Sequence, residues 1–167
     1  MEIQEGKHLT FSLGKEEYGI PILKVKEIIG MMEITHVPQT PDFIKGVINL
    51  RGKIIPIMDL RLKFKMPEKE YNERTCIIVV EVATNEAKML MGIVVDTVSE
   101  VLNIQGSEIE PPPQYSNNKI ESGFLTGLGK VKGKVVMLLN IESIINCEEM
   151  ITLFNSSANE NLVNVSR

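Results

Sequence analysis

The sequence predicts an all-β protein made of two related five-stranded β-barrels, with short connecting helices and a C-terminal helix. Three observations predict this fold class: short runs rich in Val, Ile and Leu, turn residues between those runs, and a repeat of the pattern in the second half of the chain. Closing five short strands into a barrel removes the exposed edges that an open sheet of such strands would show.

The first half contains two predicted hairpins, whose strands are His8–Leu13, Tyr18–Ile20, Val47–Leu50 and Lys53–Leu60. Between them, Ile22–Ile29 has apolar residues at a helix-like spacing and is followed by Gly30, which predicts one or two helical turns. The second hairpin turns at Arg51-Gly52, because glycine tolerates the positive φ that a tight turn needs. Pro56 lacks an amide donor, so we expect a sheet edge or a bulge there.

The second half repeats this order, with predicted strands at Thr75–Val82, Lys88–Val95, Glu121–Leu128 and Lys130–Asn140, the last of which contains a hairpin turn. Thr97–Leu102 has an apolar stripe at helical spacing and is predicted to form a helical turn. Ile141–Asn146 and Glu148–Phe154 predict the C-terminal helix. The Ser- and Asn-rich tail, 155–167, is expected to be disordered.

The order of these segments reflects an internal duplication of the sequence. Five positions recur at one constant spacing: Phe43, Gly46, Gly52, Lys53 and Asp59 match Phe124, Gly127, Gly133, Lys134 and Asn140. Upstream matches are Tyr18-Gly19-Ile20 with Met91-Gly92-Ile93, Val25 with Val98, and Glu27 with Glu100. A loop rich in Pro and Asn lengthens the second copy. We therefore expect a first lobe over residues 10–75 and a second over 76–154.

Composition and charge exclude several classes of function. The 167 residues include 18 Lys and Arg against 22 Asp and Glu, without a basic run, so we expect neither nucleic acid nor anionic lipid as a partner. The N-terminus lacks the apolar stretch of a secretion signal, and no apolar run approaches the ~18 residues of a membrane span. We therefore expect a cytoplasmic protein that does not insert into membranes. Cys76 and Cys147 are expected to stay reduced.

The sequence offers no catalytic, metal-binding or cofactor-binding set. His8 and His36 have no partner residue at ligand spacing and are expected on the surface. Gly127–Gly133 superficially resembles a phosphate-binding loop, but it lacks the GK[ST] ending and leads into a strand. Methionines in the apolar strands are expected in the core: Met58, Met89, Met91 and Met137. A β protein without such sites normally works by binding other proteins.

The blocks around the second hairpin resemble a known family. Asn49-Leu50-Arg51-Gly52, with the preceding residues 41–48 and the following Ile57–Arg61, resembles the signature of the bacterial CheW family of chemotaxis coupling proteins. Other blocks of the family are matched by Tyr18–Ile20, Gly92–Asp96 and Thr126–Leu128. The likeness runs from about His8 to Phe154. It implies two SH3-like barrels and an adaptor that joins chemoreceptor cytoplasmic tips to the regulatory domain of the histidine kinase CheA, at membrane-associated receptor arrays.

The resemblance also implies which surfaces meet the kinase. It points to Leu9, Ile22 and Val25 in the first lobe and, in the second, to the insertion near Pro113 to Tyr115. An aromatic residue in a polar loop gains little from the protein's own core, so Tyr115 is a candidate anchor for a partner. The alternative for Leu9, Ile22 and Val25 is that they simply fill the first barrel.

Receptor binding is expected in the groove between the barrels, because a receptor tip is a helical hairpin that docks through an apolar stripe. Val98 and Val101, three residues apart on the predicted helical turn, are expected to line that groove together. The resemblance implies the same role for Ile77 and for the turn Asn49-Leu50-Arg51. Arg51 has two interpretations: a cation that faces the receptor, or an internal clamp whose guanidinium binds backbone carbonyls and fixes the two lobes.

Two other functions stay open at the level of the sequence. One is a CheW-like adaptor of a non-flagellar chemosensory array, which would have the same fold and differ only in its partners. The other, less favoured, is a small-ligand-binding β-barrel. It would need a polar-lined pocket, which the sequence does not reveal.

Overall fold

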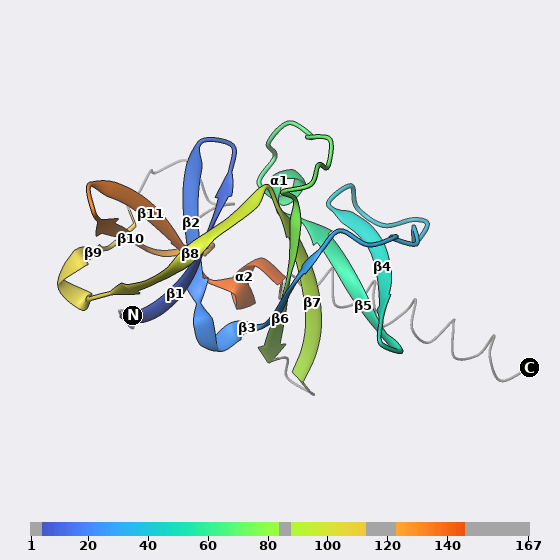
Figure 1. Ribbon diagram of the computed structural model, residues 1–167, viewed down its shortest axis with the longest axis horizontal. Helices are drawn as coiled ribbons and strands as arrows, with labels where there is room; N and C mark the ends of the chain where they lie inside the picture. Colours follow the sequence, from blue (N-terminus) through green and yellow to red (C-terminus); the bar gives the residue numbers. More distant parts are fainter. Residues whose placement is uncertain (1–4, 84–87, 113–122, 146–167) are drawn as a thin grey trace, which may run out of the picture.

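Two β-sheets dominate the structure, a computed structural model that describes residues 5–83, 88–112 and 123–145 (Figure 1). The six-stranded barrel contains, in spatial order, β8 (Thr97–Ile104), β1 (Gly6–Leu13), β2 (Glu16–Pro21), β11 (Lys134–Leu139), β10 (Leu125–Val131) and β9 (Ile109–Glu110). The five-stranded barrel contains β3 (Val25–Gly30), β6 (Cys76–Ala83), β7 (Lys88–Val95), β5 (Lys53–Asp59) and β4 (Ile44–Leu50). The all-β fold predicted from the sequence is confirmed.

Short helical segments connect the strands: the 3-10 turns η1 (Ile22–Lys24) and η2 (Gly106–Glu108), and the helices α1 (Leu60–Lys63) and α2 (Ile141–Ile145). The helices α1 and α2 follow β5 and β11, and each begins at a side-chain cap. The Asp59 carboxylate accepts the amide of Leu62 at 3.3 Å, and the Asn140 carbonyl accepts that of Ser143 at 3.2 Å. The predicted helical segment 148–154 and the tail 155–167 lie outside the described residues.

Each barrel combines strands from both copies of the sequence repeat. The first copy supplies β1 to β5 and the second supplies β6 to β11. The hairpin β1–β2, however, pairs with β8 and β11, and the hairpin β6–β7 pairs with β3 and β5. The expected lobes 10–75 and 76–154 therefore do not coincide with the two sheets. A repeat gives the order of strands inside each copy, and it does not say which copy's hairpin completes which barrel.

The internal duplication is confirmed by matching hydrogen bonds in the two barrels. β4 and β10 each carry a bulge beside the matched glycines Gly46 and Gly127. The amides of Asp59 and Asn140 each donate to the carbonyl of the matched phenylalanine at 2.7 Å. Both hairpins turn through a Lys or Arg at positive φ followed by a glycine at positive φ. The predicted turn chemistry is thus correct in both copies.

Two segments predicted as helical turns are mostly β-strand. β3 follows the single 3-10 turn η1, and β8 covers residues 97–102. Each strand has a bulge, which adds one residue between Val25 and Ile28 and between Val98 and Val101. Residues three apart across each bulge therefore face the same side of the strand, as they would on a helix. The β-branched side chains of both segments favour the strand.

Three hydrophobic cores hold the curled sheets together. The central core lies between the barrels and contains side chains from both, among them Phe11, Ile20, Met58, Met91 and Ile144. Each barrel also has an inner core of its own. β6 serves two cores, since Ile77 and Val79 enter the inner core of the five-stranded barrel and Ile78 and Val80 enter the central core. The strand methionines are buried or pack against the central core, so that prediction is confirmed.

His8 was predicted on the surface, and the structure buries it, with 1% of the residue exposed. Its neighbours Leu9 and Phe11 on β1 show the reason, because Leu9 and Phe11 face the central core and His8 must face the other side of the strand. That side is the interior of the six-stranded barrel, where a Cβ on Gly19 would contact Val136, Leu138 and His8. Both faces of β1 are covered. His36, by contrast, is exposed.

Candidate docking surfaces

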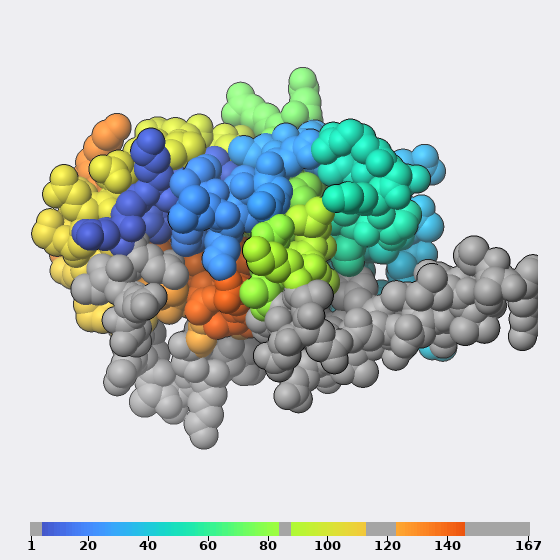
Figure 2. Space-filling view, turned by 90° about the horizontal axis from the view of Figure 1, so that it is seen from below, coloured from blue at the N-terminus to red at the C-terminus, as the bar shows by residue number. Residues whose placement is uncertain are grey.

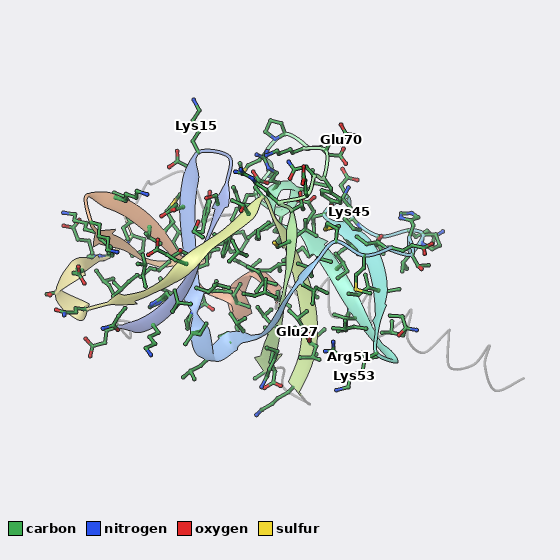
Figure 3. The ribbon with its side chains drawn as sticks, in the orientation of Figure 1. Lys15, Glu27, Lys45, Arg51, Lys53 and Glu70 are labelled. Atoms are coloured by element: carbon green, nitrogen blue, oxygen red, sulfur yellow. The ribbon has the colours of Figure 1, made fainter. Side chains whose placement is uncertain are left out.

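The turn Asn49-Leu50-Arg51 borders a cleft at one end of the five-stranded barrel. The Asn49 side chain accepts the amide of Gly52 at 2.9 Å and so fixes the turn. The cleft has a volume of about 470 Å³ and is lined by Lys26, Glu27, Leu50, Arg51, Lys53, Ile55, Val79, Glu81 and Leu90. Figure 3 shows Glu27, Arg51 and Lys53 together at this end of the barrel. An apolar floor with a rim of both charges suits contact with a protein segment.

Arg51 forms an ion pair with Glu27 of β3, inside the same barrel. The hydrogen bond between them lowers the pKa of the Glu27 carboxyl and raises the pKa of the Arg51 guanidinium. The other barrel repeats the pair, with Lys132 3.8 Å from Glu100. The Arg51 side chain is 70% exposed and its partner lies in its own sheet. The structure therefore does not support the interpretation of Arg51 as a clamp between the lobes.

A guanidinium clamp between the barrels is formed by Arg61 of α1. Its Nε and Nη2 atoms donate to the two carboxylate oxygens of Asp96 at 2.7 Å each, and Nη1 donates to the Pro67 carbonyl at 3.0 Å. Asp96 lies between β7 and β8 and also accepts the amide of Gly14, in the β1–β2 turn, at 2.7 Å. Since α1 follows β5 and Gly14 belongs to the six-stranded barrel, these bonds tie the two barrels together.

The clamp is shielded from water, with 13% of the Arg61 side chain and 10% of the Asp96 side chain exposed. Burial alone would raise the pKa of Asp96. Hydrogen bonds from Arg61 and Gly14, with the charges of Arg61 and Lys69, outweigh burial and hold the pKa of Asp96 below its ordinary value. Sequence analysis missed this role, although both residues end blocks that carry the family resemblance.

The residues expected to face the kinase are mostly covered. Leu9 is buried in the central core with 2% exposure, so its side chain cannot contact a partner, and for this residue the core-filling alternative is correct. Ile22 and Val25 are half-buried and pack against the same core. Tyr115 lies outside the described residues.

Leu23 is an exposed apolar residue that sequence analysis did not single out. It lies in η1 between Ile22 and Lys24, and 89% of it is exposed. Lys24 forms an ion pair with Glu142 of α2, which anchors the turn to the six-stranded barrel's last helix. Figure 2 shows the blue segment with η1 and β3 crossing the surface from one barrel to the other. Sequence analysis overlooked that a short turn can pack Ile22 and Val25 against the core and still leave the apolar side chain between them, Leu23, in solvent.

The residues expected to face the receptor do not gather in one groove. Ile77 is fully buried in the inner core of the five-stranded barrel, so its side chain is not a surface contact. Leu50 packs against that same core. Val98 packs against the central core, and Val101, on the same side of β8, is 49% exposed. The structure therefore separates the Asn49–Arg51 turn from the valines of β8.

An apolar hollow does lie between the barrels, beside α1. Its volume is about 170 Å³, and the rings of Tyr18, Phe64 and Phe124 line it in a row with 5.8 Å between neighbouring centroids. The full lining is Tyr18, Phe64, Met66, Phe124, Leu125, Met137 and Leu139. None of these residues was predicted as a contact, because they come from four separate segments of the chain that only the fold brings together.

Within residues 5–83, 88–112 and 123–145, no group of three or more His, Cys, Asp or Glu side chains could hold a metal ion. Among the helices of these same segments, none has the length and apolar composition needed to cross a bilayer.

Comparison with known proteins assigns this architecture to a family. Residues 7–149 match the family model of the CheW-like domain. The chain is 46% identical over 147 residues to the chemotaxis protein CheW of Klebsiella aerogenes, covering 88% of this chain and 86% of the relative. It is 34% identical over 137 residues to the CheW of Helicobacter pylori, covering 82% and 79%.

A solved structure has the same fold. The crystal structure of the scaffolding protein TtCheW from Thermoanaerobacter tengcongensis superposes with a TM-score of 0.76 at 36% identity, covering 86% of this chain and 94% of that one. The sequence likeness and the shared two-barrel fold therefore agree. The chain belongs to the CheW-like family of chemotaxis scaffolding proteins.

Proposed function

We propose that this chain is a non-enzymatic adaptor that couples the cytoplasmic tips of chemoreceptors, the methyl-accepting chemotaxis proteins, to the regulatory domain of the histidine kinase CheA. The observation that carries the proposal is one body with two separate exposed surfaces that contain apolar side chains. The shared central core and the Arg61–Asp96 clamp fix the barrels, while the η1 turn and the barrel-end cleft stay open. A rigid body of this kind can hold two partners at a constant geometry, at receptor arrays in the cytoplasm.

The kinase surface is proposed around η1. Leu23 is its exposed anchor, and Ile22 and Val25 contribute their half-exposed edges. Exposed apolar side chains at a fixed turn favour association, because binding removes them from water without ordering a flexible loop. Tyr115 stays part of this proposal as a second contact.

Replacing Leu23 with glutamate is expected to weaken kinase association by at least about tenfold, since a charge would be buried against an apolar partner. The melting temperature should change little, because the side chain contributes almost nothing to the core. Isothermal titration against the kinase regulatory domain measures the first quantity and calorimetric melting the second. Val135→Glu is the matched control, since Val135 is 54% exposed but lies at the start of β11. If wild type and Leu23→Glu bound the kinase regulatory domain with equal affinity, η1 would be excluded from the kinase-binding surface.

The receptor surface is proposed at the barrel-end cleft, and Val98 with Val101, on β8 of the other barrel, is a separate and weaker candidate. A helical hairpin can place an apolar stripe on Leu50, Ile55 and Leu90 while its charged flanks meet the rim. Two cations of the rim, Lys26 and Arg51, form ion pairs, and the side chain of Arg51 is the more exposed of the two. The Asn49 side chain fixes the backbone of the turn that carries Arg51. Coupling would then arise from differential binding of the receptor's signalling states.

Arg51→Lys is expected to keep the fold and kinase binding but to impair receptor control of the kinase. The second barrel shows that a lysine at this turn still reaches its glutamate, so the ion pair should survive. Lysine lacks the planar fork that binds a carboxylate or a carbonyl pair on a partner. A reconstituted phosphorylation assay with receptor and kinase measures the effect, and Lys132→Arg is the control at the matched turn. Normal receptor control and unchanged receptor affinity in Arg51→Lys would exclude Arg51 from the site.

The alternatives differ in their partners. Pull-downs with flagellar and non-flagellar receptors and kinases distinguish the proposed adaptor from one that serves a non-flagellar array. Calorimetry against small metabolites tests the ligand-binding barrel. Retention of a flagellar kinase and receptor together, with no metabolite heat, is the result expected here.

A further inference from the structure

The inner cores of the two barrels differ, although the barrels share one topology. The inner core of the five-stranded barrel contains six buried apolar side chains: Ile48, Ile55, Ile57, Ile77, Val79 and Val94. The described inner core of the six-stranded barrel contains four: Ile104, Val131, Val136 and Leu138. The internal duplication therefore offers a comparison in which fold and chain are constant and only the packing changes.

Two of the positions at which the cores differ lie on the exchanged hairpins. Thr10 of β1 pairs with Gly19, and Val79 of β6 pairs with the matched Gly92. Thr10 and Val79 are therefore matched positions. His8 lies two residues before Thr10 and Ile77 two residues before Val79, so His8 and Ile77 are matched as well. Two polar side chains in one barrel replace two apolar side chains in the other.

Thr10 is satisfied in its barrel, and His8 is only half satisfied. The Thr10 hydroxyl donates to the Glu100 carbonyl at 2.8 Å and accepts the Glu100 amide at 3.2 Å. His8 Nδ1 lies 3.0 Å from the Gly6 carbonyl, so it carries the proton and donates. His8 Nε2 is buried and has no hydrogen-bond partner among the described residues. As a neutral ring nitrogen it is an acceptor left unpaired, but a proton there would need an acceptor that the barrel does not supply.

The charged groups that face this side of β1 lie towards other parts of the barrel. Glu17 of β2 pairs in register with Ser12, four residues along β1 from His8, and accepts from Ser99. Glu100 of β8 pairs with Lys132 near the hairpin turn and is exposed. β10 and β11 contribute apolar side chains to this core. No described carboxylate hydrogen-bonds to the ring.

We infer that the six-stranded barrel is the acid-labile half of the molecule and that His8 makes it so. Protonation of the ring places a charge and an unpaired donor in its interior, whereas Ile77 gives the other barrel no group that titrates. Mild acid should therefore open β1, β2 and β8–β11 while β3–β7 stay closed. Burial lowers the pKa of His8 from its ordinary 6.5 more than the Gly6 hydrogen bond raises it. The opened chain thus binds more protons, and stability is constant above about pH 6.5 and falls below it.

Hydrogen exchange of the full chain, followed by NMR, tests this inference. The amides of Val136 and Leu138 are compared with their matched counterparts Ile55 and Ile57 at about pH 7.5 and about pH 5.5, after correction for intrinsic rates. Protection in the six-stranded barrel should fall about tenfold, the ratio expected for one pH unit below the ordinary histidine pKa, while the five-stranded barrel keeps its protection.

Two variants and one titration complete the test. His8→Ile should remove the acid effect, and Ile77→His should transfer it to the five-stranded barrel. An acid effect that persists in His8→Ile, or equal loss in both barrels of the wild type, would overturn the inference. If His8→Ile does not fold, an NMR titration of the His8 imidazole resonances in the wild type tests the inference. His8 is expected to stay neutral through mild acid until the barrel opens, and a His8 ring that titrates in the closed barrel contradicts the proposal.

Discussion

Asp96→Ala is expected to destabilise the protein more than the loss of any exposed ion pair. The change removes both hydrogen bonds to Arg61 and the acceptor of the Gly14 amide, and it leaves a shielded guanidinium without its partner. Breaking a largely buried pair in this way costs roughly 3 kcal/mol. Urea denaturation followed by circular dichroism measures the change in the free energy of unfolding, and the barrels should separate more readily.

The controls use the same chemistry at an exposed site. Arg51→Ala breaks the ion pair with Glu27 at the surface and should leave the melting temperature nearly unchanged. Asp96→Asn keeps an acceptor for Arg61 and should fall between the wild type and Asp96→Ala. The Asp96 contribution should be complete above the ordinary aspartate pKa of 3.8 and disappear as the pH falls through the lower folded-state pKa. An Asp96→Ala protein as stable as Arg51→Ala would show that the clamp does not hold the barrels.

Gly46→Ala is expected to be similarly damaging, by overpacking. A Cβ at Gly46 would lie 2.0 Å from the carbonyl oxygen of Thr35 and 2.7 Å from its carbonyl carbon, and the residue has a φ of 140°. Thr35 cannot move away easily, because it exchanges two backbone hydrogen bonds with Val47, at 2.8 and 2.9 Å. Overpacking and backbone strain together should cost roughly 3 kcal/mol or more.

Other glycines of the chain serve as controls for this substitution. Gly30→Ala meets no atom within 4 Å and should alter stability little. Gly127→Ala, at the matched bulge, meets Ile109 at 2.7 Å and the Glu110 carbonyl at 2.9 Å and should also destabilise. Chemical denaturation of the three variants ranks them. Equal stability of Gly46→Ala and Gly30→Ala would mean that the 35–47 contact is loose in solution.

The local parts of the fold could be predicted from the sequence, because short-range chemistry determines them. The Arg51-Gly52 turn, the matching glycine of the other copy, and the strand methionines all follow from residue type and spacing. The repeat itself was visible because the two copies need the same glycines at the same bulges. These features depend on neighbours within a few residues.

The long-range parts could not be predicted. Helix-like spacing in β3 and β8 comes from bulges that exist only opposite a partner strand. The burial of His8, Leu9 and Ile77 depends on cores that cover both faces of β1 and β6. The exchange of hairpins between the copies determines which side chains meet in each core. A sequence repeat does not reveal this exchange, because it fits exchanged and unexchanged pairing equally well.

The candidate surfaces show the same division between local and long-range information. The tight turn at Arg51-Gly52 was predicted correctly, because its chemistry is local, and the receptor contact of Asn49-Leu50-Arg51 stays a prediction. The Arg61–Asp96 clamp was missed, since its two residues are distant in sequence and meet only when the barrels are assembled. Leu23 was missed because the helical interpretation of 22–29 gave no reason for one exposed leucine.

The exchanged hairpins have a consequence for the newly made chain. During synthesis β1 and β2 leave the ribosome before the other described strands. The pairing of β2 with β11, in which Tyr18 lies opposite Met137, can form only after β11 has been made. The five-stranded barrel has all its strands once Val95 has emerged, so it can close while the first hairpin still lacks its partners. Until β11 has emerged, the edge of β2 that pairs with it is uncovered, beside the apolar face of Leu9, Phe11 and Leu13. The β1–β2 hairpin should therefore need chaperone protection for longer than the strands of the five-stranded barrel.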